Sequence, residues 1–96
     1  MFDTDIDFIL TNQIENDRVS VNHLFFPAKA QTKWHRHERD YVIVPMEDAI
    51  LKMESTDGVK DAKLSRGHCY YRDQGVEHNV YNPNDFDVTL IEIEIK

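Results

Sequence analysis

Two histidines one residue apart, His35 and His37, lie in the segment TKWHRHERDYVIVP, at the front of an apolar run. On a β-strand, residues two apart point to the same face, so both imidazoles are expected on one side, near enough to share an ion. Neutral imidazole nitrogens bind first-row metals such as zinc, iron, nickel and copper. The pair alone is a weak signal, because solvent-facing histidines at this spacing also arise by chance.

A second segment, GHCYYRDQGVEHNVYN, supplies a third histidine, His78. It lies after two glycines, Gly67 and Gly75, and before Asn82. With these two segments the chain resembles the cupin superfamily, in particular its small single-domain members. The family's motifs run Gly-x5-His-x-His-x3,4-Glu-x6-Gly and Gly-x5-Pro-x-Gly-x2-His-x3-Asn. The chain agrees with them in order and spacing over roughly residues 19–95, although Asp73 replaces the proline and no glycine ends the first motif.

The resemblance implies a divalent metal ion, zinc, iron, nickel or manganese, held inside a small barrel by His35, His37 and His78. The family's glutamate ligand has no counterpart at its usual spacing. Asp40, one residue nearer, is the preferred carboxylate, because Glu38 directly follows a ligand and should point away from its face. Aspartate is shorter, so three histidines plus waters remain the alternative. Open positions would then indicate chemistry or ligand capture and not a closed structural site.

Short strands must position these residues. Apolar and polar residues alternate in RVSVNHLFF and VTLIEIEIK, while YVIV, AILKM, CYY and HNVY are rich in β-branched or aromatic residues. Turn residues separate them, and Asp57-Gly58 predicts a hairpin. Seven or eight short strands predict an all-β sandwich or barrel, with a helical turn in DFILTNQIEND as a weaker prediction. The resemblance implies a jelly-roll, or double-stranded β-helix, barrel of two antiparallel sheets.

Length and composition limit the classes of protein. Ninety-six residues predict one domain, with 1–18 as an N-terminal extension and 19–96 as the barrel. Eighteen acidic residues against 11 basic ones give a net charge of -7, which disfavours nucleic acid and anionic membranes as partners. One cysteine excludes an intramolecular disulfide, and no segment approaches the roughly 20 apolar residues of a membrane span. The acidic start is too short in its apolar part for a signal peptide, so a cytoplasmic protein is predicted.

Three residues after Cys69 are candidates for catalysis. A tyrosine beside a metal can donate a proton or orient a substrate oxygen, which makes Tyr70 and Tyr71 candidates. Arg72 alternates with Tyr70, and an inward-pointing arginine needs a carboxylate partner, from the protein or from a substrate. The alternative is a surface arginine paired with a glutamate or an aspartate. Cys69 itself is expected to be a buried, inert thiol.

His23 is expected to share an inward face with Val19 and Val21, as a hydrogen-bonded core histidine, with a place in the barrel near the metal as the alternative. His68, beside a turn, is expected on the surface. Trp34, just before His35, is expected to cover one side of the site or to fill a dimer interface.

Three functions fit these observations. The first is an enzyme, in which the metal polarises a carbonyl or carboxylate of a small organic acid or sugar-derived substrate; the resemblance extends to dioxygenases, lyases and isomerases. The second is a non-catalytic module that binds a small sugar or acid. The third is a structural or regulatory unit, which needs four protein ligands and no cavity. The resemblance further implies a homodimer, and exposed sheet edges give a physical reason for one.

Overall fold

The computed structural model describes residues 2–96 of the chain. Within that range there are nine strands, one or two more than predicted, and no helix. A strand, and no helical turn, occupies the region near the N-terminus. The strands are β1 (Ile9–Glu15), β2 (Val19–Phe26), β3 (His35–Arg36), β4 (Asp40–Pro45), β5 (Ala49–Ser55), β6 (Gly58–Leu64), β7 (Tyr70–Arg72), β8 (Glu77–Tyr81) and β9 (Val88–Ile95).

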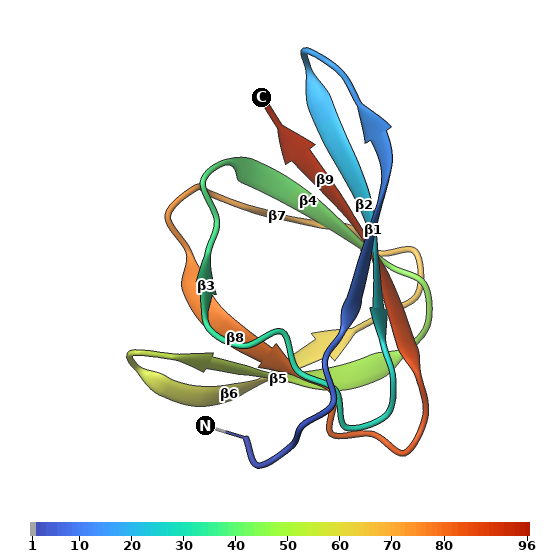
Figure 1. Ribbon diagram of the computed structural model, residues 1–96, viewed down its shortest axis with the longest axis vertical. Helices are drawn as coiled ribbons and strands as arrows, with labels where there is room; N and C mark the ends of the chain where they lie inside the picture. The colour runs from blue at the N-terminus through green and yellow to red at the C-terminus, as the bar shows by residue number, and fades with distance from the viewer. Residues whose placement is uncertain (1) are drawn as a thin grey trace.

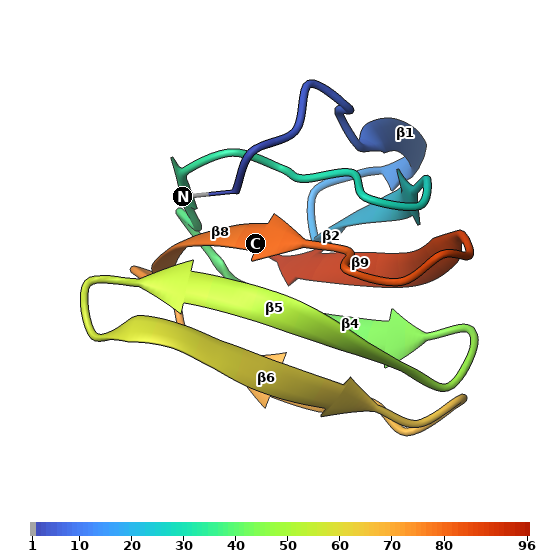
Figure 2. The same cartoon turned by 90° about the horizontal axis from the view of Figure 1, so that it is seen from below.

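The strands form two antiparallel sheets, in the order β1-β2-β9-β4-β7 and in the order β3-β8-β5-β6. Figure 1 shows the sheets facing one another, with β3 and β8 on the opposite side from β2 and β9. Seen from below in Figure 2, β5 and β6 lie along one edge of the molecule. This arrangement confirms the predicted all-β jelly roll of two antiparallel sheets.

The core fills the space between the sheets at one end of the barrel. Its largest fully buried apolar side chains include Phe26 and Leu51, which come from opposite sheets. A dry, close-packed cluster of this kind supplies most of the free energy that holds two sheets together. Its buried members are Leu24, Phe26, Tyr41, Ile43, Ala49, Leu51, Leu64, Val80, Val88 and Leu90.

The inward face of β2 is the reverse of the predicted one. In β2 the buried residues are Ser20, Asn22, Leu24 and Phe26, so the prediction that His23 faces inward with Val19 and Val21 is wrong. In β9, Glu92 is buried between half-exposed isoleucines. The outward side chains form what we call the outer apolar face, made of Ile9, Ile14, Val21, Phe25, Val42, Val44, Ile91, Ile93 and Ile95.

Turn residues behave as the sequence predicts. Thr56 and Asp57 join β5 to β6 in a hairpin, and Gly58, the first residue of β6, has a φ of 109° that other residues rarely adopt. The buried amide of Asn82 donates to the carbonyls of Phe26, Pro27 and Phe86, which fixes the loop before β9.

Strand β1 pairs with β2 along nearly its whole length, so much of the predicted extension is an edge strand of the larger sheet. Across residues 2–96, no helix has the length and apolar character needed to cross a membrane.

Candidate metal centre

The four-stranded sheet brings the three predicted histidines together through β3 and β8. In the antiparallel pair of β3 and β8, His35 lies directly opposite His78, so their side chains share a face. His37 follows β3 and is tied to the turn before β8. Its N–H donates to Val76 and its carbonyl accepts from Gly75, at 2.9 and 2.7 Å. Gly75 has a φ of 95°, a conformation that suits glycine and lets the chain double back here.

The Nε2 atoms of the three rings converge. His37 Nε2 lies 3.1 Å from His35 Nε2 and 3.1 Å from His78 Nε2. All three donor atoms lie within 4.8 Å of one another. Two metal–nitrogen bonds of about 2.1 Å at a right angle place their nitrogens about 3.0 Å apart, which matches this spacing.

In two of the rings, the partner of Nδ1 determines which nitrogen carries the proton, and so whether Nε2 has a lone pair for a metal. His35 Nδ1 lies 3.0 Å from the carbonyl of Lys33, which only accepts, so the ring proton is on Nδ1 and Nε2 keeps its lone pair. His37 Nδ1 faces Glu92 Oε2 at 3.8 Å, which favours the same tautomer. Two bare nitrogens at 3.1 Å repel unless a cation lies between them. The donor set therefore fits a metal ion.

Burial keeps the imidazoles neutral. Desolvation, followed by the charge of His35, lowers the pKa of His37 to about 4. Desolvation lowers the pKa of His78 to about 3, with smaller contributions from His35, His37 and Arg72. Neutral imidazole is the form that binds metal. These rings are thus ready to act as ligands at neutral pH.

A cavity of about 500 Å³ lies beside the histidines, inside the barrel. Tyr41 forms part of its wall, stacked on the His37 ring with 3.9 Å between centroids. This size suits a small organic molecule. The lining includes all three histidines and apolar side chains from both sheets, among them Leu24, Phe26, Ile43, Met53, Val80 and Leu90.

The structure does not bring Asp40 to the histidines. Tyr41 faces inward and is 2% exposed, so alternation along β4 turns Asp40 to the other side of the sheet. There its carboxylate accepts from the Gln74 N–H at 2.8 Å and from the Tyr71 hydroxyl, and both bonds lower its pKa. Glu38 is exposed and lies 3.8 Å from Arg36, at the mouth of the cavity. Neither Asp40 nor Glu38 lies with the three histidines in the cluster.

The three catalytic candidates on β7 lie on two faces. Tyr70 is half-buried, lines the cavity and packs against the core. Arg72 lies opposite the inward-facing Tyr41, and its guanidinium stacks 4.6 Å above the Tyr70 ring. Tyr71 is 49% exposed and bonds to Asp40 on the outer side, away from the histidines.

Other sequence predictions have mixed outcomes. Cys69 is exposed, so the prediction of a buried thiol is wrong; it lies in the turn before β7 and not within a strand. His68 lies on the surface in the same turn, as predicted. Trp34 is half exposed beside His35 and is not part of the cavity wall.

The sequence analysis missed two buried polar residues beside the cluster, Glu92 and Asn22. Asn22 Nδ2 donates to Glu92 Oε1 at 3.0 Å, and burial raises the pKa of Glu92. In the sequence, Glu92 alternates with isoleucines and Asn22 follows Val21. Alternation alone does not reveal whether the polar or the apolar residues face inward, so these two could not be identified.

Comparison with known proteins extends these observations. No family model matches the chain. The β-alanine degradation protein BauB of Pseudomonas aeruginosa is 43% identical over 86 residues, which cover 90% of each chain.

Solved structures agree with the fold. A crystal structure of a cupin domain from Bordetella pertussis Tohama I is 46% identical, covers 97% of each chain and superposes with a TM-score of 0.95. An RmlC-like cupin from Methanocaldococcus jannaschii with a double-stranded β-helix fold is 14% identical and superposes with a TM-score of 0.76, over 99% of this chain and 86% of that one. The two converging histidine motifs, the two-sheet barrel and relatives more than 40% identical over nine-tenths of the chain together show that the protein belongs to the cupin superfamily.

Proposed function

We propose that the protein binds a divalent metal ion through His35, His37 and His78 and uses it on a small organic acid in the breakdown of β-alanine. The observation that carries this proposal is the convergence of three Nε2 atoms, with a backbone carbonyl facing Nδ1 of His35 and a carboxylate facing Nδ1 of His37. When bound, the metal supplies a Lewis acid that polarises a carbonyl or carboxylate of the substrate. The histidines hold it, and the adjoining cavity receives the ligand.

The class of ligand rests on the relative and on charge. BauB is named for β-alanine degradation, and β-alanine and its products are short acids. Arg36 and Arg39 contribute to the wall of the cavity at its mouth, where a cation suits a carboxylate. Arg72 is close enough to lower the pKa of His78. Arg72 is exposed and stacks on Tyr70, which does line the cavity. We propose Tyr70 as the group that orients or protonates the acid's oxygen, and Arg72 as an anchor that reaches the acid from beside Tyr70.

The first experiment measures metal content and affinity. Purified protein should contain one zinc, iron, nickel or manganese ion per chain by elemental analysis. The His35→Ala, His37→Ala, His78→Ala triple variant should contain none. Metal retained by a folded triple variant contradicts the assignment of these ligands.

A second candidate function is binding without turnover, which the mostly apolar wall of the cavity supports. A panel of β-alanine, 3-oxo acids, unsaturated uronates and aromatic acids distinguishes the two. An enzyme converts one of them only when loaded with metal. A binding module shows heat of binding by calorimetry and no product. A purely structural metal is disfavoured, since three protein ligands and a cavity leave open positions.

We also propose that the protein is a homodimer that pairs through the outer apolar face. Ile93 of β9 lies between Val21 and Val42, and Ile91 lies between His23 and Val44, in a chain with a net charge of -7. Five strands of up to eight residues give a face of roughly 600 Å² in projection. Stable interfaces bury roughly 600–1,000 Å² of accessible surface per partner, so this face lies at the lower end of that range. Light scattering should give twice the mass of the chain.

A cytoplasmic location is proposed as well. Its support is the exposed, free thiol of Cys69, which a reducing compartment keeps unpaired. Cell fractionation with an antibody to the protein tests it.

A further inference from the structure

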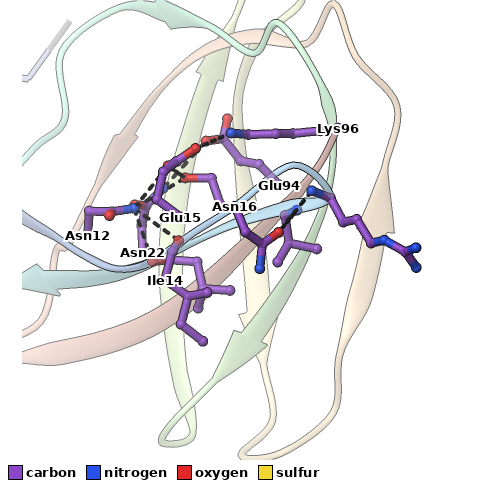
Figure 3. A network of polar contacts seen from close by, with 11 residues as sticks. Asn12, Ile14, Glu15, Asn16, Asn22, Glu94 and Lys96 are labelled. Atoms are coloured by element: carbon purple, nitrogen blue, oxygen red, sulfur yellow. Dashed lines mark hydrogen bonds and ion pairs between the residues drawn. The ribbon is translucent and has the colours of Figure 1, made fainter.

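A line of polar side chains leads from the edge of the larger sheet to the candidate metal centre. Asn12 Nδ2 donates to Asn22 Oδ1 at 2.9 Å, and Figure 3 shows these two side chains pointing toward one another from β1 and β2. Asn22 Nδ2 donates in turn to Glu92 Oε1 at 3.0 Å. The other carboxylate oxygen, Oε2, faces His37 Nδ1 at 3.8 Å. The line therefore ends on a ring whose opposite nitrogen faces the ion site.

The last three members of this line are buried. Asn22, Glu92 and His37 are 5%, 7% and 8% exposed, although the centre adjoins a cavity. A buried carboxylate is costly unless it has partners. Here Oε1 accepts from Asn22, and Oε2 faces the His37 ring at 3.8 Å. Glu92 and His37 also come from opposite sheets, so their contact joins the two halves of the barrel.

The direction of the donors makes a carboxylate necessary at position 92. Each asparagine presents its NH₂ group toward Glu92, so Oε1 must accept. Oε2 faces His37 Nδ1 at 3.8 Å, and its negative charge favours the ring proton on that nitrogen. An amide in this position would have one oxygen and one NH₂ group and could not accept on both sides.

We propose that Glu92 is a positioning residue for His37: it holds the ring proton on Nδ1 and so keeps the Nε2 lone pair directed at the metal. Asn22 in turn fixes the carboxylate. This inference rests on the proposed metal function, and it assigns to β9 a carboxylate that acts through a ligand instead of being one. Outer-shell partners of this kind contribute roughly 10–100-fold to metal affinity.

The test compares Glu92→Gln with Glu94→Gln. Glu94 lies two residues along the same strand and face, and its Oε1 is 3.5 Å from the same Asn22 amide. Among the described residues it forms no ion pair with a histidine, which makes it a matched control. Competition with a chelator measures the dissociation constant for Co²⁺. We expect Glu92→Gln to weaken binding by roughly 10–100-fold, and Glu94→Gln to leave it close to that of the unmodified protein.

A second measurement detects the tautomer directly, on metal-free protein. Long-range ¹H–¹⁵N correlation should show His37 protonated on Nδ1 and bare on Nε2 in the unmodified chain. In Glu92→Gln the oxygen stays with Asn22 and the new NH₂ group faces Nδ1, so the proton should move to Nε2. A merely structural role for Glu92 would not move this proton.

The outcomes are separable. Nε2 protonated in the unmodified, metal-free protein would overturn the inference without any variant. Unchanged affinity and tautomer in Glu92→Gln would overturn it as well, as would an equal loss of affinity in Glu94→Gln. If Glu92→Gln does not fold, Glu92→Asp keeps the charge on a shorter arm, and it should weaken Co²⁺ binding. If the unmodified chain binds no Co²⁺, the metal function fails, while the tautomer still tests Glu92.

Discussion

At the scale of single residues, His78 is the ligand that depends most on the fold, since it comes from a different strand than the other two. Replacing it with alanine removes one of three nitrogens and leaves two rings whose residues are two positions apart in sequence. We expect the affinity for zinc to fall by more than the roughly 100-fold that loss of an outer-shell partner costs at most. Calorimetric titration with zinc measures the loss.

The control for this variant is His68→Ala, which removes an exposed imidazole in the turn before β7. It should bind zinc like the unmodified protein. A His78→Ala variant that binds zinc equally well would contradict the assigned centre.

Tyr71 provides a second prediction, on the other side of the sheet. Its hydroxyl donates to the Asp40 carboxylate, and this bond, together with the negative charge, raises the pKa of Tyr71 to about 12. Forming a tyrosinate beside a carboxylate is unfavourable, so removing the charge must lower that pKa. In Asp40→Asn we expect the pKa of Tyr71 to move toward 10, by NMR titration of tyrosine ring carbons. A value that stays near 12 in the variant would show that Asp40 is not the cause.

The same variant tests where Asp40 belongs. Because its carboxylate bonds to Tyr71 and to the Gln74 N–H, Asp40→Asn should leave the affinity for metal unchanged. Loss of metal affinity would place Asp40 in the centre, as the sequence analysis preferred.

The three histidines could be predicted from sequence, because their spacing and a family resemblance determine where they must lie. Asp40 could not be placed. Tyr41 faces inward, so its neighbour Asp40 faces outward. The turn between His37 and β4 interrupts the strand, so the direction of the histidines does not predict the direction of Asp40. Glu92 could not be found either, because its contact with His37 joins residues 55 positions apart from opposite sheets.

At the scale of elements, the hairpin of β5 and β6 is the one whose geometry the sequence specifies best. Gly58 has a φ of 109°, and a Cβ there would meet nothing within 4 Å. Gly58→Ala should therefore destabilise the fold through backbone strain alone, by about 1–2 kcal/mol. Urea unfolding of the metal-free protein measures it.

Gly67 serves as the comparison for this variant. Its φ of 75° lies nearer the left-handed helical region that asparagine tolerates, and it too has open space around it. Gly67→Asn should cost much less free energy than Gly58→Ala. Equal costs would mean that backbone conformation does not explain either one.

The strands themselves were predicted from alternation, but alternation has two solutions for each strand. In β2 and β9 the β-branched set points outward, while Asn22 and Glu92 point into the barrel. The usual assumption, that the apolar set faces the core, fails here because the open end of the barrel is polar. The inward polar residues therefore lie at the candidate site, and the outward β-branched residues form the outer apolar face.

At the scale of the whole molecule, the outer apolar face predicts association. Ile93 lies at its middle, between Val21 and Val42. A glutamate there would bury a charge against an apolar partner, so Ile93→Glu should yield monomers that remain folded. Analytical ultracentrifugation gives the mass, and far-UV circular dichroism checks the fold.

Val59→Glu is the matched control, since Val59 is also exposed but lies on β6, in the other sheet. It should not change the mass of the assembly. An Ile93→Glu variant with the mass of the unmodified protein would contradict the proposed interface.

The far end of the β5–β6 hairpin has a practical consequence. Strand β6 is the free edge of its sheet, and Lys60, Asp61 and Lys63 give it alternating charges that discourage edge-to-edge pairing. Its tip at Asp57-Gly58 belongs neither to the cavity wall nor to the outer apolar face. A fluorophore or affinity peptide inserted there would give a labelled protein for titration and pull-down work, with ligand uptake and pairing both left intact.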